Sequence, residues 1–81
     1  MTAPPRPRLV VYTRAGCHAC DEMIAELSRR LAGRAVGVEI RDVDADPETR
    51  RRYGLKVPVL TIDGQPACSG RLDEDALDGL P

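Results

Sequence analysis

Two cysteines three positions apart are the residues of this sequence best suited to chemistry. Cys17 and Cys20 follow an apolar run over residues 9–12 and open a helical pattern. At this spacing the two side chains share a helix face, with Cβ atoms roughly 5–6 Å apart, so little backbone movement would join them. Cys17 lies at the helix start, where unpaired N–H groups and the macrodipole favour a thiolate, the nucleophilic form. The pair therefore predicts thiol–disulfide chemistry.

Positively charged side chains flank this pair. His18 lies between the cysteines, where an imidazolium would stabilise a thiolate and relay protons, or would simply be a solvated residue of the first turn. Arg14 and Lys56 either add positive charge near the site or are ordinary surface residues. Cys68 is predicted to be a small buried hydrophobic residue rather than a third redox group.

A metal site built on the same cysteines is the main alternative. Structural zinc takes four ligands, and beyond Cys17 and Cys20 the sequence offers only Cys68 and His18. Because His18 lies within the helix turn, angled away from both sulfurs, we expect no metal within one chain and no bound cofactor. A thiol-based metal-binding module or metallochaperone, or a metal shared between two chains, stays open. So does an interaction domain in which the disulfide merely stiffens the fold.

Hydrophobic periodicity predicts four strands and three helices that would position the pair. The apolar run 9–12 is typical of a central strand covered on both faces. The helix after it, which we expect to end at Gly33, carries apolar residues at helical spacing: Cys20, Met23, Ile24, Leu27 and Leu31. A second strand is expected over 36–41, and a second helix from Asp46-Pro47 to Tyr53-Gly54. Strands 59–62 and 66–68 form a hairpin around Asp63-Gly64. A last helix starts at Asp73, with Leu72 and Leu77 placed across its cap.

The predicted order is β-α-β-α-β-β-α. A right-handed crossover makes the first two strands parallel, and the hairpin makes the last two antiparallel. We therefore predict an α/β fold with a four-stranded mixed sheet flanked by helices. A Cys-x-x-C beside a βαβ pattern indicates the thioredoxin-type arrangement.

Length and composition indicate one small domain. The chain has 81 residues, and residues 1–8, rich in Pro and Arg, are expected to form a flexible leader before a domain over 9–81. The net charge is −1 and no apolar run approaches the roughly 18 residues of a membrane span, so we expect neither nucleic acid nor membrane as partner. Three cysteines are too few for a secreted disulfide scaffold, so we expect a cytoplasmic protein, and a monomer.

The order and spacing of several segments resemble the small bacterial glutaredoxin-like proteins of the thioredoxin superfamily. The resemblance covers nearly the whole chain after residue 8. The matching segments are residues 12–21, 44–48, 52–54, 57–60 and 70–72. The motif reads Cys-His-Ala-Cys where well-studied glutaredoxins have Cys-Pro-Tyr-Cys, and Lys56 stands where they have threonine.

This resemblance implies a thiol–disulfide oxidoreductase. Cys17 would be the attacking thiol and Cys20 the resolving thiol, and Pro58 would be cis and face the pair. The backbone of Val57 would pair with the bound substrate chain. From their positions beside the cysteines, and not from the resemblance, Arg14 and His18 are expected to contribute to substrate binding. The implied partners are disulfide-containing proteins or small disulfides, and a reductant that is either glutathione or an enzyme of the thioredoxin-reductase type.

The resemblance also implies a place for glutathione as a co-substrate. The Gly-Gly pair of the family's glutathione site falls on Ser69-Gly70, and an acidic residue that meets the glutathione amine falls on Asp73. Glycine permits the closest approach of a ligand because it carries no Cβ. Since one of the two positions is Ser69, we predict weak glutathione dependence.

Overall fold

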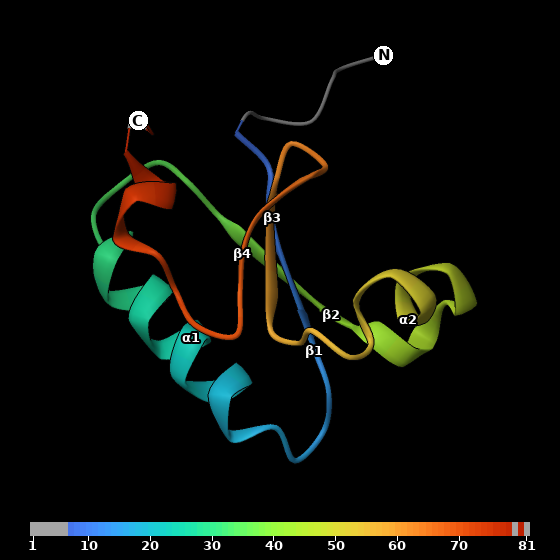
Figure 1. The fold of residues 1–81 in the computed structure, drawn as a ribbon. Coiled ribbons are helices and arrows are strands. Elements are labelled where there is room, and N and C mark those ends of the chain that lie inside the picture. Colours follow the sequence, from blue (N-terminus) through green and yellow to red (C-terminus); the bar gives the residue numbers. More distant parts are fainter. Residues whose placement is uncertain (1–6, 79, 81) are drawn as a thin grey trace.

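A four-stranded mixed sheet forms the centre of this computed structural model, which describes residues 7–78 and 80 (Figure 1). The strands are β1 (Leu9–Thr13), β2 (Val38–Asp42), β3 (Val59–Ile62) and β4 (Gln65–Ser69). They lie in the order β2-β1-β3-β4, with β1 parallel to β2 and antiparallel to β3, and β3 antiparallel to β4. The predicted mixed sheet with a central first strand is confirmed. Most of the predicted leader, residues 1–6, lies outside the described residues.

Helices lie on both sides of this sheet (Figure 1): α1 (His18–Arg30) on one side and α2 (Pro47–Tyr53) on the other. Two short 3-10 turns complete the order, η1 (Val43–Ala45) before α2 and η2 (Glu74–Leu77) after β4. None of the helices in the described part of the chain is both long and apolar enough to span a membrane.

The two faces of the sheet carry separate apolar clusters because side chains alternate along each strand. Leu9 and Val11 of β1 belong to the larger cluster, beneath α1. Its buried members are Leu9, Val11, Met23, Leu27, Leu31, Leu60 and Leu77. On the opposite face, Val43, Tyr53 and Val59 form a smaller cluster with Tyr12 and Val57 against it. A strand that is apolar on both faces is thus covered on both, as the sequence predicts.

The helical pattern of α1 buries the residues that it was expected to bury. Cys20, Met23 and Leu27 are buried, and Ile24 packs at the margin of the cluster. The helix ends at Arg30, and the turn after it reaches Gly33 at a φ of 80°, the left-handed conformation expected there.

Local turn and cap residues set α2 and the hairpin where the sequence predicts them. The Asp46 carboxylate accepts a hydrogen bond of 2.8 Å from the Glu48 N–H, so it caps α2. Asp63 and Gly64 both have positive φ, 51° and 85°, as a two-residue hairpin turn requires.

Two element predictions need correction. The second strand begins at Val38 rather than at residue 36, because its ladder with β1 begins at the pair Leu9 and Val38. The last element is a 3-10 turn of four residues and not an α-helix, although Asp73 caps it as expected. Its sequence offers only Leu77 as a buried residue, too little apolar surface to hold a longer helix against the sheet. Leu77 and the partly buried Leu72 both join the larger core cluster.

Candidate active site

The turn between β1 and α1 fixes the position of Cys17. The Cys17 N–H donates to the Arg14 carbonyl at 3.2 Å, and Gly16 takes a φ of 77°, a conformation that suits glycine. Cys17 is the N-cap of α1, in an extended conformation, and its Sγ accepts a hydrogen bond of 3.1 Å from the Cys20 N–H. The sulfur therefore occupies the position in which a capping oxygen usually lies, where free N–H groups stabilise negative charge.

Cys17 and Cys20 are joined in a disulfide, with Cα atoms 5.2 Å apart. The two residues differ in access to solvent. Cys17 is half-buried, whereas Cys20 is only 1% exposed. An incoming molecule can therefore reach the sulfur of the cap residue more readily than the sulfur one turn inside the helix.

His18 and Arg14 both have carboxylate partners. The His18 side chain is 90% exposed, and its Nε2 lies 3.4 Å from Oε1 of Glu22, one turn along the helix. The Arg14 guanidinium donates to both carboxylate oxygens of Asp44, each at 2.8 Å. Its third hydrogen bond goes to the Gly54 carbonyl, also at 2.8 Å. Arg14 thus ties the cysteine-bearing turn to η1 and to the end of α2, and its charge is balanced by Asp44.

This ion pair shifts both groups in the direction expected of close opposite charges. The hydrogen bond with Asp44 raises the pKa of Arg14, and the hydrogen bond with Arg14 lowers the pKa of Asp44. Asp44 and Gly54 are positioning residues that the sequence did not reveal. They lie 30 and 40 positions from Arg14 along the chain, so no local motif links them.

Pro58 and Gly70 lie at the end of the sheet where β1 leads into the cysteine-bearing turn. The Val57–Pro58 peptide bond is cis, as expected from the resemblance, and Pro58 is fully buried. Because Tyr12 pairs with Val59, Pro58 comes next to the end of β1. The Pro58 carbonyl accepts a hydrogen bond of 2.9 Å from the Gly70 N–H.

The remaining predicted residues lie in β4 or directly after it. Ser69 is exposed and pairs with Val59 across the hairpin, and Gly70 takes a φ of 82°. The Asp73 carboxylate accepts from the Asp75 N–H at 3.0 Å, so it caps η2. Cys68 is half-buried and packs against the larger core cluster.

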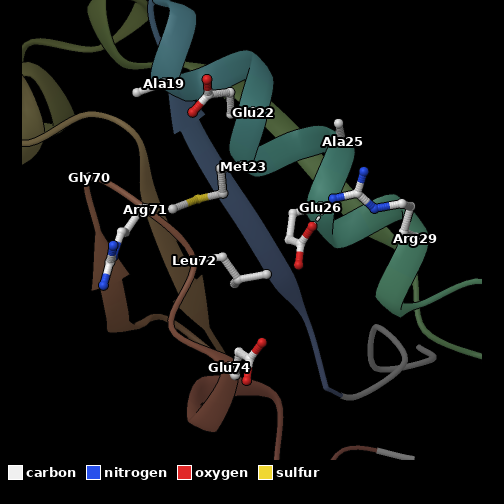
Figure 2. Close-up of a pocket in the computed structure, with 10 residues that line it drawn as sticks. All are labelled: Ala19, Glu22, Met23, Ala25, Glu26, Arg29, Gly70, Arg71, Leu72 and Glu74. Carbon is white, nitrogen blue, oxygen red and sulfur yellow. Dashed lines mark hydrogen bonds and ion pairs between the residues drawn. The ribbon is translucent and has the colours of Figure 1, made fainter.

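A groove of about 420 Å³ begins at the cysteine motif and runs along α1 (Figure 2). Ala19, which lies between the two cysteines, lines it on the helix side, and Gly70 lines it on the other. Figure 2 shows Met23 and Leu72 between the walls, with Glu22, Glu26 and Arg29 along the helix. An elongated molecule bound near the cysteines would find an apolar floor and charged rims here. A further hollow of about 740 Å³ lies beside Ser69 and Asp73.

Within residues 7–78 and 80, no group of three or more histidine, cysteine, aspartate or glutamate side chains is arranged to hold a metal ion.

Comparison with known proteins identifies the family of this chain through one family model. The family model described as a glutaredoxin-like domain matches residues 8–79. Proteins of Mycobacterium tuberculosis and Mycobacterium bovis, named only as uncharacterized, are 32% identical over 77 residues, which cover 89% of this chain and 79% of each relative.

Solved structures are also similar. A protein from Nitrosomonas europaea has a TM-score of 0.78 and 35% sequence identity, over 95% of this chain and 94% of that one. A protein from X. campestris has a TM-score of 0.68 and 30% identity, over 85% of this chain and 88% of that one. Glutaredoxin C1 from Populus tremula x tremuloides, in its holo form, has a TM-score of 0.53 and 14% identity, over 79% of this chain and 67% of its own. This last likeness concerns the fold alone, and it agrees with the predicted thioredoxin-type arrangement.

Proposed function

This chain belongs to the glutaredoxin-like domain family, and from that membership we propose that it is a thiol–disulfide oxidoreductase that reduces protein or small-molecule disulfides. The observation that carries the proposal is the arrangement of the pair. Cys17 is half-buried at a helix start, its sulfur accepts a backbone N–H, and it is joined to the buried Cys20. A thiol in such a place ionises more readily than a free thiol. The resulting thiolate is accessible and can attack a sulfur of a substrate disulfide.

The proposed reaction is a two-electron exchange in two steps. In the reduced protein, the Cys17 thiolate attacks one sulfur of the substrate disulfide. A mixed disulfide forms, and the other substrate sulfur leaves as a thiolate that takes a proton. The Cys20 thiol then loses its proton and attacks Cys17 Sγ. The second substrate sulfur leaves, and the Cys17–Cys20 disulfide of the structure results. A reductant must return two electrons to begin the next cycle.

The substrate chain is proposed to lie along the segment that carries Val57 and Pro58, directly before β3. Val57 is half-buried and precedes β3, which runs antiparallel beside β1. Its backbone would pair with an extended substrate segment and hold the substrate sulfur near Cys17. Arg14 supports this arrangement indirectly, through Asp44 and Gly54. His18 lies on the exposed side of the helix start, where it would meet the substrate rather than the buried Cys20.

Cysteine variants test this division of labour. Cys17→Ser is expected to abolish reduction of insulin or of hydroxyethyl disulfide, because no accessible nucleophile of the pair remains. Cys20→Ser is expected to accumulate a mixed disulfide with substrate, detectable by intact mass spectrometry, because the second step is blocked. Cys68→Ala is the matched control and should behave as wild type in both assays. If Cys20 were the trapped residue, or if both variants trapped substrate equally, the assignment would be reversed or wrong.

Glutathione is proposed as a weak electron donor at Ser69, Gly70 and Asp73. Ser69→Gly should strengthen the dependence of activity on glutathione, because removing the side chain lets the ligand approach the backbone more closely. Asp73→Ala should weaken it. Since Asp73 also caps η2, Asp73→Asn serves as a control that keeps a capping side chain but removes the charge. Assays that compare glutathione with thioredoxin reductase as the electron source give the readout. Saturation at low glutathione, unchanged in all three variants, would place the donor elsewhere.

A further inference from the structure

The outer edge of β2 is an unpaired strand edge that carries an exposed apolar side chain. In the part of the chain that the structure describes, β2 pairs with β1 alone, and residues 39–42 are exposed. Ile40 is 52% exposed. Among all the residues that the structure describes, Leu55 is the other large apolar side chain that is exposed. The opposite edge strand, β4, contains Pro66, which has no N–H to offer to a neighbouring strand. β2 has no such protection.

The backbone of Ile40 faces this open edge. The Arg41 carbonyl accepts a hydrogen bond of 3.4 Å from Thr13 Oγ1, so the backbone groups of Arg41 face β1. Backbone direction alternates from one residue of a strand to the next. The N–H and carbonyl of Ile40 therefore point away from β1, where another strand could pair with them.

An apolar groove of about 310 Å³ adjoins the same edge. Ile24 and Leu31 of the α1 region line one side, and Val36, Val38 and Ile40 line the other. Ile40 is directly opposite Val11, a member of the core cluster under α1, so its side chain lies on the α1 face of the sheet. An occupant of the edge would therefore cover the exposed part of Ile40 and the mouth of the groove together.

We propose that this edge binds β2 of a second copy of the chain, antiparallel, with the twofold axis at Ile40. In that register Glu39 is opposite Arg41 of the second copy, and Arg41 is opposite its Glu39. Glu39 and Arg41 already lie on one face, where they form an ion pair with each other. Centring the axis on Glu39 or on Arg41 would oppose like charges, which destabilises a strand pair.

Among the registers centred on residues 39, 40 and 41, charge complementarity thus selects the one centred on Ile40. The two sheets would join into one, the backbone groups of the two Ile40 residues would pair, and the two Ile40 side chains would meet over adjoining grooves. Cys17 caps α1 and Cys20 lies in its first turn, and neither is on β2, so the proposal is independent of the redox function.

Solution mass measurements test this dimer. Light scattering or sedimentation over a concentration series, with Cys68→Ala as background to exclude intermolecular disulfides, should show a species of twice the 8.8 kDa chain mass at high concentration. Ile40→Lys should weaken association by about tenfold or more, because it places a charge at the centre of the contact. Leu55→Lys is the matched control, since it alters the other exposed apolar side chain, and it should leave association unchanged.

A charge exchange separates this register from any other contact. Glu39→Arg and Arg41→Glu should each weaken association, because each opposes like charges across the axis, and the double variant should restore it. Circular dichroism of every variant establishes that it is folded. At about 1 mM protein, even a dimer with a Kd of about 1 mM would be populated. A single 8.8 kDa species up to that concentration would therefore overturn the proposal. So would a dimer insensitive to Ile40→Lys, or a double variant no better than either single one.

Discussion

At Gly54, the absence of a side chain allows the end of α2 to contact Arg14, which supports the candidate active site. Its φ of −57° is an ordinary helical value, so backbone freedom is not the reason for glycine here. A Cβ at this position would collide with the Arg50 carbonyl oxygen and would lie 3.3 Å from Arg14 Nη2. The Gly54 carbonyl is itself an acceptor for Arg14. The close approach of the end of α2 to the Arg14 side chain therefore depends on the absence of a side chain at Gly54.

Gly54→Ala is consequently expected to destabilise the protein by about 1–3 kcal/mol, the usual range for overpacking a tight site. The added methyl group must push the end of α2 away from Arg14. Gly37→Ala is the matched control, because a Cβ there meets nothing within 4 Å and the residue has no positive φ. Urea unfolding of both variants measures the effect. Equal stabilities of the two variants would show that this contact is not tight.

At this scale, the sequence predicted the residues whose roles depend on local spacing. Cys17 and Cys20 were singled out from their separation and from the helix that follows, and they form a disulfide. The cis bond before Pro58 was expected from the family resemblance together with the place of Pro58 before a strand. The engagement of Arg14 could not be predicted, because its acceptors Asp44 and Gly54 become neighbours only when the chain folds. Arg14 was expected either to add positive charge near the site or to be an ordinary surface residue, whereas in the structure its charge is balanced by Asp44.

At the scale of elements, the Arg14–Asp44 pair joins the turn before α1 to η1. Both side chains are more than a third exposed, so solvent screens the pair and its contribution to stability is modest. Its geometry is the useful part, because two parallel hydrogen bonds fix the orientation of the guanidinium. The cysteine-bearing turn is thereby held against α2.

The pH dependence of stability should report this pair. Arg14 lowers the pKa of folded Asp44, whereas the unfolded carboxyl titrates near its usual value of about 3.9. The stabilisation is therefore complete above that value and is lost as the pH falls through the lower folded pKa. Asp44→Asn should lower stability slightly at about pH 6 and should lose less stability on acidification than wild type does.

Urea unfolding across this pH range gives the comparison. Arginines also lower the pKa values of Glu26 and Glu39, so part of the acid sensitivity should remain in the variant. High salt should shrink the difference between wild type and Asp44→Asn, because at about 1 M the screening length falls to about 3 Å. Identical pH profiles for the two proteins would mean that the pair forms no effective interaction in solution.

Elements with local signals were predicted closely, and those without were not. The cap at Asp46 and the turn at Asp63-Gly64 are set by short-range hydrogen bonds and backbone preferences, so α2 and the hairpin lie where expected. The start of β2 depends instead on its register with β1, which no residue of β2 encodes alone. The length of the last helix depends on how much apolar surface the sheet leaves for it to cover.

At the scale of the whole molecule, stability rests on a small aliphatic core. The sequence contains no Phe or Trp, and the only aromatic residues are two tyrosines, which stack on each other with ring centroids 5.1 Å apart. An 81-residue domain is expected to have only about 4–12 kcal/mol of stability in total. A single cavity in the larger cluster would therefore remove a large fraction of it.

Leu60→Ala is the variant that should show this most clearly. Leu60 is on β3, is 0% exposed and belongs to the cluster that joins α1, β1 and Leu77. The loss of its side chain should lower the free energy of unfolding by about 2–5 kcal/mol. Leu55→Ala removes the same atoms from a side chain fully exposed to solvent, and it should have little effect. Thermal unfolding followed by circular dichroism measures both.

Because Leu60 is buried in the core and lies outside the Cys17–Cys20 motif, disulfide reduction by Leu60→Ala should fall only in proportion to its unfolded fraction. A Leu60→Ala protein as stable as Leu55→Ala would mean that the aliphatic cluster is not what holds the sheet and α1 together.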